Sequence, residues 1–386
     1  MTRSGWLLLV LYAAAGMVAS YFCAFAHHCN NFAIYRSAFA NIGAGRNLYG
    51  QHPGAHWDLF KYSPTFALLM APFAMLPFVA SMVLWDVANA LVLFAAIYLL
   101  FDGKQRVIAL ALVLIGFALS TDGSQVNPLL AGLVILAFVA LERNDVGRDT
   151  IAALAIGVAT VTKIFPIAAA TMVLRRRSAL RFSCILAVTL VVLIALPLAV
   201  TSGGALLQQY RWWYGILNHD VRATGVSLLE TLSWLGYRRN NVYPELFGLG
   251  VLLAPLLLVR EPWDATRRRL FLASVLLYVV LFNPQAERPT FSFALTGIAI
   301  WFVSAPRNTA RTMLLAATGV VLPMAMVADI SEGALGTWKH VPLQALVACC
   351  ASIWIVIQLD MLRLSTRWAA IDLVRDSTEV GSASPA

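Results

Sequence analysis

Charged residues are scarce in this chain of 386 residues: Asp, Glu, Lys and Arg make up 12%, whereas 60% of the residues are hydrophobic. Soluble globular domains carry about 25% charged residues. The mean hydropathy is +0.77, and apolar blocks of about 20 residues are long enough to span a bilayer as helices. The sequence therefore predicts an all-α, polytopic integral membrane protein and excludes a soluble domain.

Familiar catalytic motifs are also missing. The chain contains no P-loop, no Gly-x-Gly-x-x-Gly, no His-Glu-x-x-His and no Gly-x-Ser-x-Gly motif. Nothing predicts a nucleotide site, and we expect no cofactor. Surface imidazoles are favoured over a metal site, because no standard ligand spacing relates His27, His28, His52 and His56.

The five cysteines lack a metal-binding pattern. Cys184, Cys349 and Cys350 lie within apolar blocks, where we expect buried free thiols. Cys23 and Cys29 lie near the outer end of the first apolar block. They are the one pair placed for a disulfide, although free thiols are the favoured interpretation there too.

The net charge of +9 is spread over short basic clusters between apolar blocks. An excess of Lys and Arg in short loops marks the cytoplasmic side of a membrane protein. We expect the clusters to be cytoplasmic and the polar segments between them to face outward. The clustering also argues against a nucleic-acid partner. The clusters lie at 175–181, 260–269, 307–311 and 363–367.

Apolar blocks divide the chain into about 10–12 predicted helices, transmembrane or re-entrant. The polar intervals 27–62 and 201–244 are predicted to be outer loops. Residues 1–375 are expected to form one transmembrane domain, and residues 376–386 a disordered cytoplasmic tail. The expected helices cover residues 6–26, 64–76, 79–101, 107–120, 128–141, 150–174, 182–200, 245–259, 270–282, 290–304, 312–328 and 341–359.

Two of these blocks contain helix breakers. Prolines interrupt 63–77, and Lys163 with Pro166 interrupts 150–174. If both blocks cross the bilayer, the polar break 121–127 lies inside; if both are broken or re-entrant, it lies outside. Irregular backbone is tolerated at membrane depth where it lines a polar cavity, so we favour the second arrangement.

The interval 27–62 is rich in polar side chains. Lys61 stands just before Pro64, and proline suits the first turn of a helix. The free N–H groups of that turn and the charge of Lys61 predict an anion site. Arg36 supplies a second cation, and Asp58 supplies a carboxylate.

Charges inside apolar blocks require a reason, because a charge in lipid is costly. We expect Lys163 to face a polar cavity and bind an anion; otherwise it reaches the membrane surface or pairs with Asp86. Asp86 shares a helix face with Asn89, which favours a structural role. Glu287, in the polar break 283–290, is a further candidate carboxylate.

Four motifs, in order, resemble those of the GT-C glycosyltransferases, and more closely the bacterial polyprenyl-phosphate-mannose-dependent α-1,2-mannosyltransferases. NNFAIYRSAFANIGAGRNLYG is similar to that family's Asp-x-x-x-Tyr and Gly-x-x-Leu-Tyr stretch. FKYSPTFALLMAPFAMLP resembles its Tyr-Pro-Pro helix, SQVN its Gly-Gln-x-Asn element and TKIFP its Lys-x-x-Pro element. The likeness spans about residues 30–180 and fades beyond.

The resemblance implies a GT-C-like bundle in the bacterial cytoplasmic (inner) membrane, with its active site facing the periplasm or exterior. It implies transfer of a sugar, mannose in that family, from a polyprenyl-phosphate donor to a hydroxyl of a glycan or glycolipid. The donor phosphate is then expected to bind Lys61, Arg36 and Lys163. The substrates are expected to contact Asn31, Tyr35, Gln125, Asn127 and Arg288.

The family's early catalytic aspartate is replaced here by Asn31. An amide cannot take the proton of the acceptor hydroxyl, so another carboxylate has to be the base. We predict Asp58 for this role, with Glu287 as the alternative. Because phosphate leaves without a general acid, one base suffices, and preplaced cations stabilise the departing charge.

Three other functions are compatible with the sequence. A transporter or flippase for lipid-linked glycans would use Asp86, Lys163 and the broken helices as a path near the bilayer midplane, although no inverted repeat is visible. A lipid-glycan ligase or polymerase would use the interval 201–244. A structural membrane subunit is the third, if Asn31 marks a lost activity.

Overall fold

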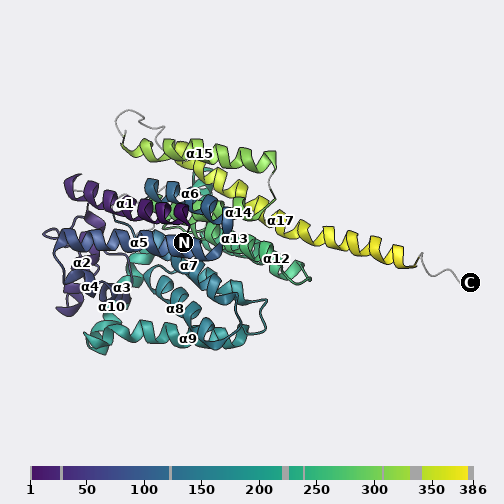
Figure 1. Cartoon of the computed structure of the whole chain (residues 1–386). Coiled ribbons are helices and arrows are strands. Elements are labelled where there is room, and N and C mark those ends of the chain that lie inside the picture. Colours follow the sequence, from purple (N-terminus) through teal and green to yellow (C-terminus); the bar gives the residue numbers. More distant parts are fainter. Residues whose placement is uncertain are drawn as a thin grey trace, which may run out of the picture.

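The computed structural model describes residues 2–26, 29–120, 124–219, 226–237, 240–306, 308–330 and 341–380. Within these ranges the chain forms helices and no strands, which confirms the predicted all-α class. The helices build one bundle, in which α9 (Ala179–Ala195) and α15 (Thr309–Ile330) lie at opposite edges of the view in Figure 1.

Among the described residues, four helical stretches are long and apolar enough to cross a membrane. They are α1 (Arg3–Ala26), α5 (Phe78–Leu100), α9 with its 3-10 continuation η2 (Leu196–Ala199), and α17 (Val341–Val380). Three shorter helices are also apolar: α7 (Asn127–Leu141), α12 (Val242–Leu258) and α15. These helices agree with a polytopic membrane protein.

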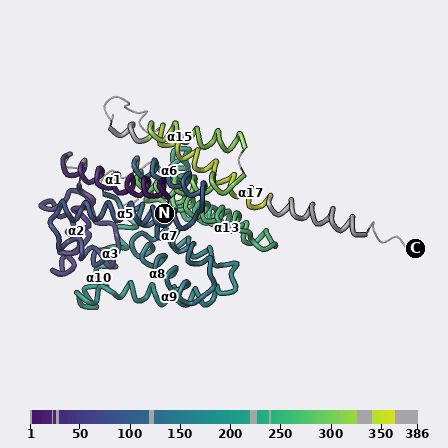
Figure 2. The backbone as a smooth tube through the Cα atoms, in the orientation of Figure 1, coloured from purple at the N-terminus to yellow at the C-terminus, as the bar shows by residue number. Residues whose placement is uncertain are grey.

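The centre of the bundle is a row of neighbouring helices. Helix α5 packs against α1 and α7, and the row continues through α8 (Val146–Thr162) to α9. Figure 2 follows this row from α1 to α9. Helices α13 (Ala265–Leu281) and α14 (Phe291–Ser304) form a second pair that is almost wholly buried. Helix α6 (Gly103–Ser120) packs on α14, and α17 packs on α13.

Glycines allow the close contacts between these helices. A Cβ on Gly16 of α1 would lie 2.9 Å from the carbonyl oxygen of Asp86 in α5. A Cβ on Gly297 of α14 would lie 2.9 Å from the carbonyl oxygen of Ala273 in α13. Membrane helices associate through such close backbone packing, because lipid removes the hydrophobic driving force between them.

The two segments with helix breakers are interrupted where their sequences predict. Helix α8 ends at Thr162, Lys163 is extended (φ −135°, ψ 134°), and the 3-10 helix η1 (Phe165–Val173) follows. The other segment divides into α3 (Pro64–Leu69) and α4 (Ala71–Ala74). With six and four residues, neither reaches the roughly 20 residues of a membrane-spanning helix.

The polar intervals contain helices that were not predicted from the sequence. The interval 27–62 contains α2 (Asn30–Gly43), and the interval 201–244 contains α10 (Gly203–His219) and α11 (Leu228–Trp234). Helix α17 continues to Val380 and so passes residue 376, where disorder was expected to begin; residues 381–386 lie outside the described ranges.

The cysteines also differ from expectation. Cys23 at the end of α1 and Cys29 before α2 form a disulfide, so the preference for free thiols was wrong for this pair. Cys350 is a buried free thiol as expected, whereas Cys349 is half-buried and Cys184 is exposed.

Candidate active site

The candidate site is built around the start of α3. Ser63 caps this helix, because its Oγ accepts a hydrogen bond from the backbone N–H of Phe66 at 3.3 Å, and Pro64 occupies the first turn. Lys61 lies just before the cap. The Nε1–H of Trp213, in α10, donates to the carbonyl oxygen of Lys61 at 3.0 Å. Local capping and a contact from a distant helix therefore hold the lysine backbone.

Lys61 brings the two candidate bases together. Its Nζ lies 3.9 Å from Oδ2 of Asp58 and 3.8 Å from Oε1 of Glu287. The three side chains are 27%, 37% and 36% exposed, respectively. Partly exposed ion pairs contribute little to stability. The arrangement therefore leaves Lys61 able to exchange a carboxylate for another anion at low energetic cost.

Local hydrogen bonds position both Asp58 and Glu287. Oδ1 of Asp58 accepts from the backbone N–H of Leu59 at 2.7 Å, and the carbonyl oxygen of Asp58 accepts from Nδ1–H of His56 at 2.7 Å. Glu287 precedes η3 (Arg288–Thr290) and forms a capping box with Thr290, whose Oγ1 accepts from the Glu287 N–H at 3.0 Å. The capping box fixes the polar break between α13 and α14.

Lys163 joins this group through Tyr62. Its Nζ lies 5.7 Å from the centroid of the Tyr62 ring, within the range of a cation–π interaction. The charge of Lys163 also interacts with those of Glu287 and Lys61. The break between α8 and η1 therefore places a second cation beside the first.

Two buried tyrosines contribute hydrogen-bonding hydroxyl groups to the site. The hydroxyls of Tyr35 and Tyr62 share a hydrogen bond of 2.8 Å, and the Tyr35 hydroxyl lies 3.5 Å from Oε1 of Gln125. Burial raises the pKa of Tyr35 and that of Tyr62, and the negative charge of Glu287 raises both further. Both hydroxyls therefore stay neutral at physiological pH and remain hydrogen-bond donors.

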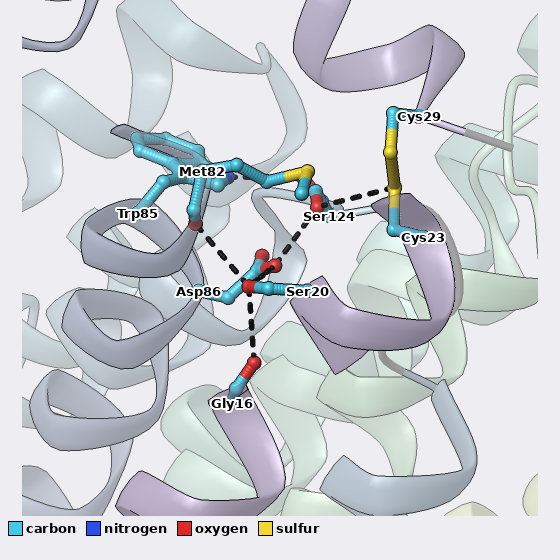
Figure 3. Close-up of a disulfide and its surroundings, with 8 residues drawn as sticks. All are labelled: Gly16, Ser20, Cys23, Cys29, Met82, Trp85, Asp86 and Ser124. Atoms are coloured by element: carbon cyan, nitrogen blue, oxygen red, sulfur yellow. Dashed lines mark hydrogen bonds between the residues drawn. A yellow bond between two sulfur atoms is a disulfide. The ribbon is translucent and has the colours of Figure 1, made fainter. Parts of the chain in front are cut away.

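Asp86 has the structural role that its sequence context predicts. Figure 3 shows its carboxylate between two buried serines. Oδ2 of Asp86 accepts from Ser20 Oγ of α1 at 2.6 Å and from Ser124 Oγ at 2.9 Å. Ser124 has a positive φ of 57° and precedes Gln125, so this network sets where Gln125 meets Tyr35. Among the ion pairs of the described residues, the alternative pairing of Asp86 with Lys163 is not found.

The remaining predicted residues join the group less directly. Asn127 is fully buried, and its amide finds no hydrogen-bond partner within the described ranges. Asn31 lies half-buried on α2. The Arg36 guanidinium lies 5.7 Å from the centroid of the Phe78 ring, and no contact in the described part of the chain joins it to Lys61. Arg288 opens η3, directly after Glu287.

Metal ligands do not cluster in the described part of the chain: no group of three His, Cys, Asp or Glu side chains converges there. The rings of His52 and His56 have centroids 5.6 Å apart. His52 Nε2 pairs with the carbonyl oxygen of Asn47 at 2.9 Å. His27 and His28 lie outside the described residues.

Sequence reasoning missed the contribution of α10. Besides Trp213, this helix presents Gln209, whose Nε2 donates to the carbonyl oxygen of Arg46 at 2.7 Å and whose Oε1 accepts from the N–H of Leu48 at 3.2 Å. Residues four apart lie on one helix face. That spacing is a signal for a helix, but nothing in the sequence shows that this face packs on the first polar interval.

The model of Glycosyltransferase family 87 matches residues 60–329, which is more than half of the chain. The chain belongs to glycosyltransferase family 87. Family 87 membership and the apolar helices together identify a membrane glycosyltransferase. A search of curated proteins found no significant match.

The family 87 match has different limits from the resemblance seen in the sequence. It continues to residue 329, whereas the likeness was expected to fade near residue 180. It begins at Phe60, so it includes Lys61, Lys163 and Glu287 but not Asn31 or Asp58.

Proposed function

We propose that this glycosyltransferase moves a sugar from a polyprenyl-phosphate-linked donor to a hydroxyl of a glycan or glycolipid acceptor. The observation that carries the proposal is the position of Lys61, within 4 Å of both Asp58 and Glu287, with Lys163 close by. Two cations and two carboxylates at one helix start suit a reaction in which a phosphate departs and a hydroxyl loses its proton.

The two lysines are the proposed phosphate site. In the departing step the bond between the sugar anomeric carbon and the phosphate oxygen breaks, and the phosphate keeps the electron pair. Lys61 and Lys163, already placed beside the site, stabilise that charge without reorganisation. The free N–H groups at the start of α3 add a partial positive charge. Arg36, which lies on α2, is proposed as an additional contact to the donor phosphate.

Asp58 is the proposed base. Its carboxylate takes the proton of the acceptor hydroxyl while that oxygen attacks the anomeric carbon. Glu287 starts a capping box and carries a negative charge close to both lysines. This position suits a counter-charge that the donor phosphate displaces from the lysines. Asn31, Tyr35, Gln125, Asn127 and Arg288 are proposed substrate contacts.

The proposed orientation follows from charge. Lys163 precedes η1, and the basic cluster at 175–177 follows the other end of η1. Similarly, the basic cluster at 260–269 lies at the start of α13, and Glu287 follows the end of that helix. Basic loops remain on the cytoplasmic side, so we place the site at the outer face of a bacterial cytoplasmic membrane. Mannose is the proposed sugar, on the resemblance to mannosyltransferases.

The test uses purified full-length protein in nanodiscs with polyprenyl-phosphate-mannose and a glycolipid acceptor. We expect donor consumption by the wild type and none by Asp58→Asn. The matched control is Asp102→Asn, a carboxylate that is 94% exposed at the start of α6, which should leave transfer unchanged. Thermal unfolding checks that both variants fold.

Three outcomes would overturn parts of the proposal. An active Asp58→Asn with an inactive Glu287→Gln assigns the base to Glu287. Full activity in both variants shows that the site lies elsewhere. No consumption of any polyprenyl-phosphate sugar, together with movement of a lipid-linked glycan across vesicle membranes, assigns the chain to the transporters.

A further inference from the structure

A cavity lies far from the candidate active site. It has a volume of about 490 Å³ and opens among the arginine-rich ends of α7, η1, α12 and α13. Helix α7 begins beside Gln125 and ends at this cavity. Its 15 residues separate the two places by roughly 20 Å. The cavity is lined by Phe138, Leu141, Glu142, Met172, Arg175, Arg176, Leu256, Arg260, Pro262, Trp263, Arg268 and Phe271.

The lining is strongly positive, with four arginines and a single carboxylate. Arg268 is paired, because its Nε and Nη2 donate to the two oxygens of Glu142 at 2.9 and 2.8 Å. Arg176 lies 3.7 Å from Asp149, but Arg181 also pairs with that carboxylate at 2.6 Å. One negative charge is therefore shared by two arginines, and positive charge is left in excess.

Arg175 forms part of the wall and is not paired with a carboxylate of the described residues. Its guanidinium donates to backbone carbonyls at the end of α12 and just after it, at 3.0 Å to Leu256, 3.1 Å to Arg260 and 3.0 Å to Glu261. It also lies 5.4 Å from the centroid of the Trp263 ring. Carbonyls and a ring satisfy its donors, but no carboxylate of the described residues lies within ion-pair distance.

Arg260 is the available cation of the lining. Its side chain is exposed and makes no hydrogen bond or ion pair with any described residue. The hydrogen bond from Arg175 goes to the backbone carbonyl of Arg260 and does not involve the Arg260 side chain. A guanidinium with five free donors at the rim of a positive cavity matches the oxygens of a phosphate.

The other half of the lining is apolar and lies beside lipid-facing surface. Met172, Leu256 and Phe271 line the cavity. Leu257 and Leu258, which follow Leu256 in α12, are exposed. Exposed leucines at the end of an apolar helix contact acyl chains in a bilayer. The cavity thus meets lipid on one side and arginines on the other.

We propose that this cavity binds the phosphate headgroup of an anionic phospholipid, with part of an acyl chain against Met172, Leu256 and Phe271. Basic pockets between membrane helices suit such headgroups, because the charge attracts the phosphate and the apolar wall accepts the chain. A soluble phosphate would use the same arginines but would leave the apolar wall uncovered. The proposal does not depend on the glycosyl donor, since the site lies at the other end of the bundle.

The test compares wild type, Arg260→Gln and Arg177→Gln in nanodiscs of phosphatidylcholine mixed with phosphatidylglycerol. Native mass spectrometry measures which lipid stays bound to the released protein. We expect the wild type to retain phosphatidylglycerol over phosphatidylcholine and Arg260→Gln to retain about fivefold less, equal to about 1 kcal/mol for one arginine. Arg177 is exposed in the cluster 175–181, next to the lining residues Arg175 and Arg176, but does not itself line the cavity, so its variant should match the wild type.

A parallel titration of delipidated protein with inorganic phosphate distinguishes a lipid from a soluble ligand. Phosphate binding that is lost in Arg260→Gln, without retention of phosphatidylglycerol, would overturn the assignment to lipid. Equal retention by wild type and Arg260→Gln, or equal losses in Arg260→Gln and Arg177→Gln, would overturn the site. Arg260→Glu against Arg177→Glu repeats the comparison with inverted charge and should enlarge the difference.

Discussion

Nζ of Lys61 lies 3.8 Å from Oε1 of Glu287, although the two residues come from opposite halves of the sequence. Lys61 precedes α3, and Glu287 lies in the break between α13 and α14. The ion pair joins the first polar interval to the buried helix pair of the second half. A donor phosphate bound at Lys61, as proposed, would compete with Glu287, so the proposed site couples substrate binding to this contact.

Replacing Lys61 by Gln should lower kcat/KM for the polyprenyl-phosphate donor by about 10²–10³-fold, the usual effect of losing one preplaced group that stabilises developing charge. Stability should change by less than about 1 kcal/mol, because the ion pairs are partly exposed. Steady-state kinetics and thermal unfolding measure the two effects. Lys104→Gln, at an exposed lysine of α6, is the control; equal kinetics in both variants would remove Lys61 from the site.

Trp213→Phe should lower transfer about fivefold. The substitution keeps the aromatic ring but removes the Nε1–H that donates to the Lys61 carbonyl oxygen, and a net hydrogen bond contributes about 1 kcal/mol. Trp212 next to it is more exposed, so Trp212→Phe should behave as wild type. Initial rates at saturating and limiting donor check this prediction, which fails if the two variants are alike.

Asp86→Ala should destabilise the protein by about 1–3 kcal/mol, because the buried hydroxyls of Ser20 and Ser124 would lose their shared acceptor. Asp86→Asn keeps one acceptor oxygen and should recover part of the loss. Denaturant or thermal unfolding in detergent provides the measurement, with the exposed Asp102→Ala as control. An Asp86→Ala protein as stable as Asp102→Ala would contradict the network in Figure 3.

Gly16→Ala should destabilise the contact of α1 with α5 by about 1–3 kcal/mol, the usual cost of overpacking. The new Cβ would lie 2.9 Å from the Asp86 carbonyl oxygen, and this clash exceeds the gain of about 1 kcal/mol that Ala has over Gly in a helix. Gly319 in α15 has nothing within 4 Å, so Gly319→Ala should be neutral or stabilising. Opposite signs in thermal unfolding are the expected result.

Local patterns predicted several features of the fold correctly. Apolar blocks predicted the helical class, and the breakers Lys163 and Pro166 predicted the change from α8 to η1. These features depend on backbone chemistry within a few residues. Pro64 similarly predicted the start of α3, since its missing N–H is harmless only in a first turn.

The helices of the polar intervals were not predicted, because the many polar residues were given more weight than the helical spacing of the apolar ones. In α2 the buried residues Phe32, Tyr35, Ala38 and Ile42 recur at helical spacing, which was a usable signal. The interval was nonetheless assigned as a loop, because its polar residues suggested a solvent-exposed segment.

The sequence by itself determined that this chain is a bundle of apolar helices with lysines and carboxylates at polar breaks. Helix length, capping and charge depend on residues that are neighbours in the sequence. Only the tertiary structure decided which of these residues meet. Packing places Asp58, Lys61, Lys163 and Glu287 together and leaves Arg36 over Phe78. Contacts between distant segments depend on how helices cross, and that geometry arises from the whole set of buried side chains at once.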